Sequence, residues 1–236
     1  MAHAATQSTQ TSRVRLAVLG AGKMGGILIK AFLTRGLVPP ENISPTVQHP
    51  AQERKTFSKL PVTVGTDNRA AARASDVILL CVKPQAVGQV VDEIGPELDD
   101  RKLVISIAAS VPTDYIERPL RAKVPVIRAM SNTPSMVGAG ITAISKGRFA
   151  TQKDLDVART LFDSVGKTVV VDEKNMDAVT GLSASGPALI YVILESLSLR
   201  RCQNGPVAGT ATAPGGTNCT GRCKGRSRNR RSSCPA

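Results

Sequence analysis

The stretch VRLAVLGAGKMGGILIKAFLTRG, residues 14–36, decides the fold of this 236-residue chain. It opens with an apolar run at 14–19 that only Arg15 interrupts, passes through Gly20-Ala21-Gly22, and continues as an amphipathic segment from Lys23 to Arg35. This order predicts a buried strand, a tight turn and a helix. Because this arrangement is typical of nucleotide-binding α/β proteins, the turn is the first candidate site.

The glycines of this turn have the spacing G-x-G-x-x-G. Gly20 permits the tight turn, Gly22 lets the backbone approach a pyrophosphate, and Gly25 lets the helix pack closely on the strand. The helix N-terminus offers free N–H groups and the positive end of its dipole to phosphates. We therefore expect a dinucleotide here. The alternative is a glycine-rich turn that holds no ligand.

The chain from residue 43 to residue 171 alternates between apolar runs and helical patterns. Such alternation implies parallel strands joined by right-handed crossovers. We predict an α/β fold with a Rossmann-like, doubly wound and mostly parallel sheet, followed by the start of an all-helical domain. Helices are expected at 68–74, 87–94 and 155–164. Further strands are expected at 43–48, 62–64, 76–82, 103–108, 124–130, 140–145 and 167–171.

The composition changes abruptly at Arg200. Residues 200–236 contain no acidic and no aromatic residue, but they hold four of the five cysteines and eight basic residues. We predict four regions. They are a disordered lead-in at 1–12, an NAD(P)-binding domain at 13–174, the truncated start of a helical dimerisation and substrate domain at 175–199, and an aberrant, disordered basic tail at 200–236.

The net charge of +13 resides mainly in the tail, which contributes +8 and leaves +5 for the rest. No base-reading module precedes the tail, so specific nucleic-acid binding is not expected. The apolar runs are shorter than the ~20 residues that cross a bilayer, so no membrane partner is expected. The cysteine spacings do not fit a zinc site, so no metal is expected. Without the features of a targeting segment, a cytoplasmic location is expected.

The end of the second predicted strand indicates which dinucleotide is bound. An NAD site normally has an acidic residue there to hold the ribose 2′-hydroxyl. This chain reads ISPTVQHP at 43–50, without an acid. The missing carboxylate removes a repulsion against a 2′-phosphate, so NADPH is favoured, with NADH as the alternative. Thr46, Gln48 and His49 are candidate hydrogen-bond donors.

Four segments together resemble pyrroline-5-carboxylate reductase, the enzyme family that makes L-proline. They are LGAGKMG (19–25), CVKPQ (81–85), SNTPSMVGAGITAI (131–144) and DAVTGLSASGPALIYVILESL (177–197). The last segment is the most specific, and the resemblance runs from about Val14 to Leu199. It implies hydride transfer from NADPH to the C=N carbon of 1-pyrroline-5-carboxylate, with no metal and no covalent nucleophile, in a homo-oligomer.

The resemblance also implies site residues. Asn132, Thr133 and Glu173 would lie near the substrate. No catalytic group is assigned, and Thr133 and Lys83 are the candidates. For Lys83 a solvated strand end is the alternative, and for the loop at 132–134 a simple turn. The cofactor would be bound by Leu19, Gly20, Ala21, Gly22, Lys23, Met24, Asn68, Cys81, Val82, Lys83, Pro84, Ala108 and Ala109.

Three positions depart from the family pattern. Glycine is more usual than Ser110 and Ala184, and proline or threonine is more usual than Ser131. These exchanges between small residues put the fine geometry in doubt rather than the family.

The sequence beyond Leu199 does not continue the family pattern. The motif at 213–217 superficially matches the family's substrate loop, but the helices that should precede it are absent. Pro214–Lys224, read one nucleotide later with permitted codons, becomes LAAQTALGAAK, an amphipathic helix of the kind the family has. We therefore expect a frameshift near Leu199, missing dimer helices, and weak or no reductase activity.

Two other functions remain open. One is another Rossmann oxidoreductase of the hydroxy-acid dehydrogenase type, which shares G-x-G-x-M-G. Those enzymes carry a lysine on the interdomain helix, where this chain reads PALIYVILESL at 187–197. The other is a non-catalytic remnant that binds the cofactor or a polyanion.

Overall fold

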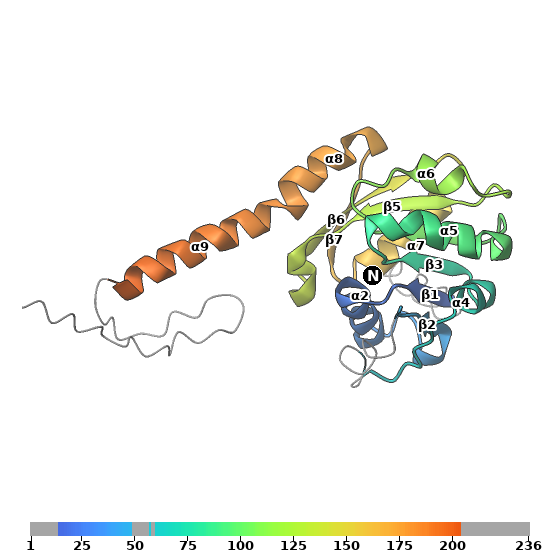
Figure 1. Cartoon of the computed structure of the whole chain (residues 1–236), viewed down its shortest axis with the longest axis horizontal. Helices are drawn as coiled ribbons and strands as arrows, with labels where there is room; N and C mark the ends of the chain where they lie inside the picture. The colour runs from blue at the N-terminus through green and yellow to red at the C-terminus, as the bar shows by residue number, and fades with distance from the viewer. Residues whose placement is uncertain (1–13, 49–56, 58–59, 204–236) are drawn as a thin grey trace, which may run out of the picture. The chain divides into compact units, whose positions relative to one another are not determined.

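The computed structural model describes residues 14–48, 57 and 60–203 (Figure 1). The expected lead-in at 1–12 and the tail from 204 onward lie outside these residues, as does His49. The side chains from 199 onward are also outside the description, including that of Cys202.

The described residues form one seven-stranded sheet in the order β2-β1-β3-β4-β5-β6-β7. Neighbouring strands are parallel except β5 and β6, which are antiparallel. This arrangement confirms the predicted Rossmann-like, mostly parallel sheet. The strands are β1 (Leu16–Leu19), β2 (Ile43–Pro45), β3 (Val77–Leu80), β4 (Leu103–Ser106), β5 (Val126–Met130), β6 (Gly140–Lys146) and β7 (Gly166–Val170).

Helices cover both faces of the sheet. Because successive side chains of a strand point to opposite faces, Leu16 and Val18 belong to one core cluster while Ala17 and Leu19 belong to the other. All four are fully buried. The first cluster includes residues of α2 (Lys23–Thr34) and α7 (Gln152–Phe162), and the second includes residues of α4 (Asn68–Ala74), α5 (Val87–Ile94) and α6 (Thr113–Glu117).

Two helix starts are fixed by local side chains. The Asp67 carboxylate accepts the Ala70 N–H at the start of α4. Thr151 and Asp154 form a capping box at the start of α7, so that helix begins at Gln152 rather than at the predicted 155. These caps are short-range features.

The prediction of a strand at 62–64 is wrong. That segment runs beside β2, but only an isolated bridge between Thr46 and Gly65 forms. The predicted strand at 43–48 shortens to Ile43–Pro45. The short helix α6 and the antiparallel direction of β6 were not predicted, because neither has a hydrophobic period long enough to identify it.

The chain continues through a 3₁₀ turn (Glu173–Asn175), α8 (Met176–Val179), a π-helical turn (Thr180–Ala184) and α9 (Gly186–Gln203). Residues up to Pro187 belong to the compact unit of the sheet, and those from Ala188 onward form a second unit. Helix α9 extends four residues beyond Leu199, into the region expected to be tail.

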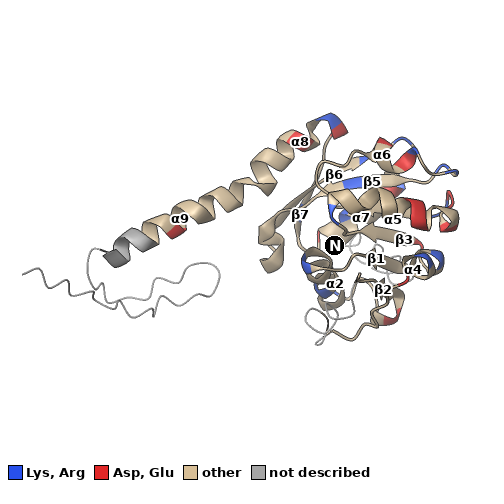
Figure 2. Ribbon diagram, viewed as in Figure 1, with Lys and Arg blue, Asp and Glu red and all other residues tan. Residues whose placement is uncertain are grey.

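Between Gly186 and Ser198, helix α9 has apolar residues on all sides, and its large apolar side chains are exposed. Leu189, Val192 and Leu197 are 60% exposed or more, and Glu195 is the one charged residue between 186 and 198 (Figure 2). The helical stretch Glu173–Ser198 is long and apolar enough to cross a membrane by length and composition alone. One such stretch is weak evidence for a membrane protein.

Candidate functional site

Four loops meet at one edge of the sheet. Strands β1, β3, β4 and β5 are adjacent and parallel, so their carboxyl ends lie side by side. The segments that follow them are 20–24, 81–84, 107–109 and 131–133. These loops hold nearly all of the predicted site residues. The carboxyl edge of an open parallel sheet is where such folds bind ligands.

The geometry of the glycine turn fits a pyrophosphate. Gly20 has φ +74°, and a Cβ there would collide with the Val82 side chain. A Cβ on Gly25 would lie 3.3 Å from Val18 Cγ1, so Gly25 sets the close packing of α2 on β1. A Cβ on Gly22 would have no neighbour closer than 3.9 Å. The space beside Gly22 is therefore open to a ligand.

A polar network joins this turn to the adenosine side of the expected site. The backbone N–H of Ala21 donates to the Thr46 carbonyl at 2.7 Å. The Thr46 hydroxyl donates to Asn68 Oδ1 at 2.7 Å, and Asn68 Nδ2 donates to Glu93 Oε2 at 2.9 Å. Asn68 is thus held in one orientation beside the turn. Sequence reasoning named Thr46 as a candidate donor, but it predicted neither the bond from Thr46 to Asn68 nor the contact with Glu93.

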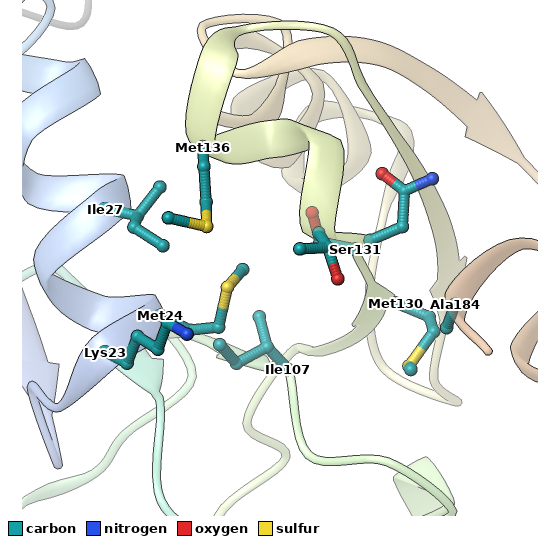
Figure 3. Close-up of a pocket in the computed structure, with 10 residues that line it drawn as sticks. Lys23, Met24, Ile27, Ile107, Met130, Ser131, Met136 and Ala184 are labelled. Atoms are coloured by element: carbon teal, nitrogen blue, oxygen red, sulfur yellow. The ribbon is translucent and has the colours of Figure 1, made fainter. Parts of the chain in front are cut away.

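A pocket of about 330 Å³ opens at this edge, between the start of α2 and the loop after β5 (Figure 3). Its wall is largely apolar, and three methionines contribute to it. Such a wall suits a flat ring better than a charged group. The pocket is lined by Lys23, Met24, Ile27, Ile107, Met130, Ser131, Asn132, Thr133, Met136 and Ala184.

The loop after β5 is internally hydrogen-bonded. The Thr142 hydroxyl donates to Ser131 Oγ at 3.0 Å, and the hydroxyls of Ser131 and Ser135 are 2.8 Å apart. Asn132 is buried, whereas Thr133 is exposed toward solvent at the pocket. These bonds hold the loop in place where it borders the pocket.

The residues of the loop after β3 differ in how far they are exposed to solvent. Burial raises the pKa of the Cys81 thiol above its ordinary value, so the sulfur stays protonated and is a poor nucleophile. Lys83 and Pro84 are exposed, and Val82 is half-buried against Gly20. After β4, Ala108 is buried and Ala109 is half-buried. Small side chains there leave the edge accessible.

Known proteins were compared with the whole chain. A family described as NADP oxidoreductase, coenzyme F420-dependent, matches residues 15–110. A pyrroline-5-carboxylate reductase of Methanosarcina acetivorans is 40% identical over 184 residues, which are 78% of this chain and 68% of that protein. The chain belongs to the pyrroline-5-carboxylate reductase family. The chain spans 68% of the length of the Methanosarcina acetivorans enzyme and 58% of that of a reductase from Macaca fascicularis.

Solved structures of pyrroline-5-carboxylate reductases share the fold. The enzyme from Coxiella burnetii has a TM-score of 0.74 and 31% identity, covering 82% of this chain and 72% of that one. The enzyme from Plasmodium falciparum, solved with NADP bound, has a TM-score of 0.74 and 27% identity, covering 84% of this chain and 72% of that one. The sheet with helices on both faces is thus the fold of this reductase family.

Within this pyrroline-5-carboxylate reductase fold, Glu173 lies away from the pocket lining. Its carboxylate accepts the Thr113 N–H at 2.7 Å and the Thr113 hydroxyl at 2.6 Å. Arg128 lies 3.7 Å from the same carboxylate and donates to Asp177 Oδ1 at 2.8 Å. Glu173 therefore fastens the segment after β7 to the sheet instead of facing the pocket with Asn132.

Arg128 was missed by sequence reasoning. It is buried in the middle of β5, where a charged side chain is expected only if it is paired. The signal was present, since an arginine interrupts the apolar run VPVIRAM at 124–130. Its two carboxylate partners come 45 or more residues later, and no local pattern identifies them.

Two departures from the family pattern have structural counterparts. Ser110 has φ +59°, a conformation that glycine adopts without strain, which accounts for the more usual glycine there. Ala184 lines the pocket opposite α2, so its methyl group makes part of the wall (Figure 3).

Proposed function

We propose that this chain binds NADPH along the carboxyl edge of the sheet. The proposal extends to the activity of its relatives, the reduction of 1-pyrroline-5-carboxylate to L-proline. The observation that supports cofactor binding is the open space beside Gly22. A neighbouring strand and Thr46 hold this turn in place. Residues 81–84 and 107–109 extend the same edge toward the pocket.

NADPH bound at this edge would supply the hydride for the reduction. The protein's part is then to hold two carbons in contact and to exclude water, which contributes to rate by positioning. The largely apolar wall formed by Met24, Ile27 and Met136 suits a nicotinamide ring. Ser131 and Thr133 bring hydroxyls to the same pocket.

The electrophile in this reaction is the protonated cyclic imine. The imine can accept a hydride without first forming a covalent bond to the enzyme. A Cys81 thiol that burial keeps protonated agrees with this, because such a thiol is a poor nucleophile. Lys83 is exposed at the carboxyl end of β3 and can donate to a phosphate or carboxylate from there. We assign it to binding rather than to proton transfer.

Turnover by this chain is expected to be weak, because the sequence beyond Leu199 departs from the family pattern. A cytoplasmic location is consistent with Cys81 as a free thiol among the residues that the structure describes.

The test is a fluorescence titration of the full chain with NADPH, paired with Gly22→Ala. A methyl group at Gly22 meets no protein atom, so thermal stability should change by less than about 0.5 kcal/mol. The same methyl group would occupy the space for the phosphates and weaken binding by about tenfold or more. Equal affinity in the two proteins would refute this site.

A second assay follows NADPH oxidation with pyrroline-5-carboxylate. We expect NADPH binding with little or no turnover. Turnover at the rate of a complete relative would contradict the expected loss of the substrate half while leaving the cofactor site intact.

A further inference from the structure

Asn132 uses both ends of its side-chain amide within the protein. Its Oδ1 accepts the backbone N–H of Ile141 at 3.0 Å, at the start of β6. Its Nδ2 donates to the carbonyl and to the hydroxyl of Ser183, each at 3.3 Å. A buried side chain so engaged has little capacity left for a substrate.

The carbonyl that Asn132 contacts is one that the following helix does not satisfy in the α-helical manner. In an α-helix the Ser183 carbonyl would accept the N–H of residue 187, but that residue is proline and has no N–H. The preceding turn is already π-helical, with the Ser185 N–H donating to the Thr180 carbonyl at 3.0 Å. Asn132 supplies a donor that the local sequence lacks.

This bond lies at the pocket. Asn132 and Ala184, the residue after Ser183, both line it. The start of the segment 173–184 makes two further contacts with the sheet unit. Glu173 accepts a hydrogen bond from Thr113, and Asp177 accepts one from Arg128. Those two contacts fix the start of the segment, whereas the Asn132 contact fixes the end that forms the wall.

We propose that Asn132 is a positioning residue: its amide replaces the N–H that Pro187 lacks and so holds the π-helical turn 180–184 as a wall of the pocket. Only the use of that wall for NADPH rests on the proposed function. The contact between Asn132 and Ser183 does not depend on the proposed function, and it can be tested without cofactor.

The test is a double-mutant cycle of Asn132→Ala and Pro187→Ala in the full chain. Amide hydrogen exchange of residues 176–187 is measured by mass spectrometry. Asn132→Ala leaves the Ser183 carbonyl without this donor, and exchange should become about tenfold faster or more. Pro187→Ala provides an N–H at residue 187. In the double variant it should restore exchange to within about threefold of the parent.

Asn132→Asp gives an independent reading, including the case in which Asn132→Ala does not fold. The aspartate still accepts the Ile141 N–H but cannot donate to Ser183, so exchange at 176–187 should rise and Pro187→Ala should reverse it. Strictly additive effects of the two positions, or an aspartate variant with parental exchange, would overturn the proposal.

NADPH affinity of the same proteins separates the two proposals. If Asn132 positions the wall, affinity should fall in Asn132→Ala and recover with Pro187→Ala. If the parent chain does not bind NADPH, the proposed function fails, while the exchange cycle still decides the role of Asn132.

Discussion

The sheet and helix α9 are both built from apolar sequence, yet they differ completely in burial. Leu16–Leu19 are fully buried between two layers of helices, whereas Leu189 is 65% and Ile193 54% exposed. The strands present alternate residues to two covering layers. Helix α9 is apolar on every side, and such a helix needs partners on every side. Apolar composition therefore predicts that a segment is more stable when buried, but neighbouring elements decide whether it is buried.

The largest effect that tests this comparison comes from one truncation made in both regions. Ile29→Ala, in α2, removes a fully buried side chain and should lower the free energy of unfolding by about 2–5 kcal/mol. Ile193→Ala, in α9, should change it by less than about 0.5 kcal/mol. Urea unfolding of both variants measures this. A loss of similar size at Ile193 would show that α9 is covered in solution.

A second contrast tests the glycine turn of the sheet unit. Gly20→Ala combines a positive φ with a collision against Val82 and should cost about 2–5 kcal/mol. Gly36→Ala is the matched control, since Gly36 has φ +61° but no neighbour for a Cβ. It should cost only about 1–2 kcal/mol. Thermal unfolding compares the two, and equal losses would mean that Val82 moves aside.

Even the well-packed unit contains strain that can be relieved. Ser110→Gly replaces a residue at φ +59° with one that adopts this conformation freely. The gain of about 1–2 kcal/mol is partly offset by the greater freedom of glycine in the unfolded chain, leaving about 0.5–1 kcal/mol. A rise in melting temperature is expected, and Ser135→Gly, at a residue whose φ is not positive, should show none.

The smallest effect concerns pH. Burial raises the pKa of Glu117 above 4.5, opposed by the backbone N–H groups of Arg148 and Phe149 and assisted by the charges of Glu173 and Asp114. The folded state thus binds this proton more tightly, so its contribution to stability is greatest below pH 4.5 and is lost as pH rises through the raised pKa.

Glu117→Gln removes this loss while its carbonyl oxygen can still accept the Arg148 N–H. The variant should gain stability relative to the parent as the pH rises from 4.5 through the raised pKa, in a comparison of urea midpoints. A difference that does not change with pH would contradict the assignment to Glu117.

Sequence reasoning was reliable where the determinants are close together in the chain. The fingerprint at 20–25, the strands around 77–80 and 103–106, and the helix at 87–94 follow from local glycines and local period. The strand predicted at 62–64 does not form. The segment has β-branched residues, but it lies beside the edge strand β2 and makes only an isolated bridge there. The expectation that Glu173 lies near the substrate comes from the resemblance alone. No local pattern indicates that Thr113 and Arg128, distant in sequence, hold its carboxylate.

By itself, the sequence determined the family, the α/β architecture and the glycine turn, because these depend on residues within one strand, turn and helix. It also shows that Pro187 has no N–H to donate. Only the tertiary structure decided which group donates in its place, because Asn132 lies 51 residues before Ser183. Strands β6 and β7 and helices α7 and α8 lie between the two residues in the chain. Contacts between distant residues are set by how the elements pack, and no local pattern encodes them.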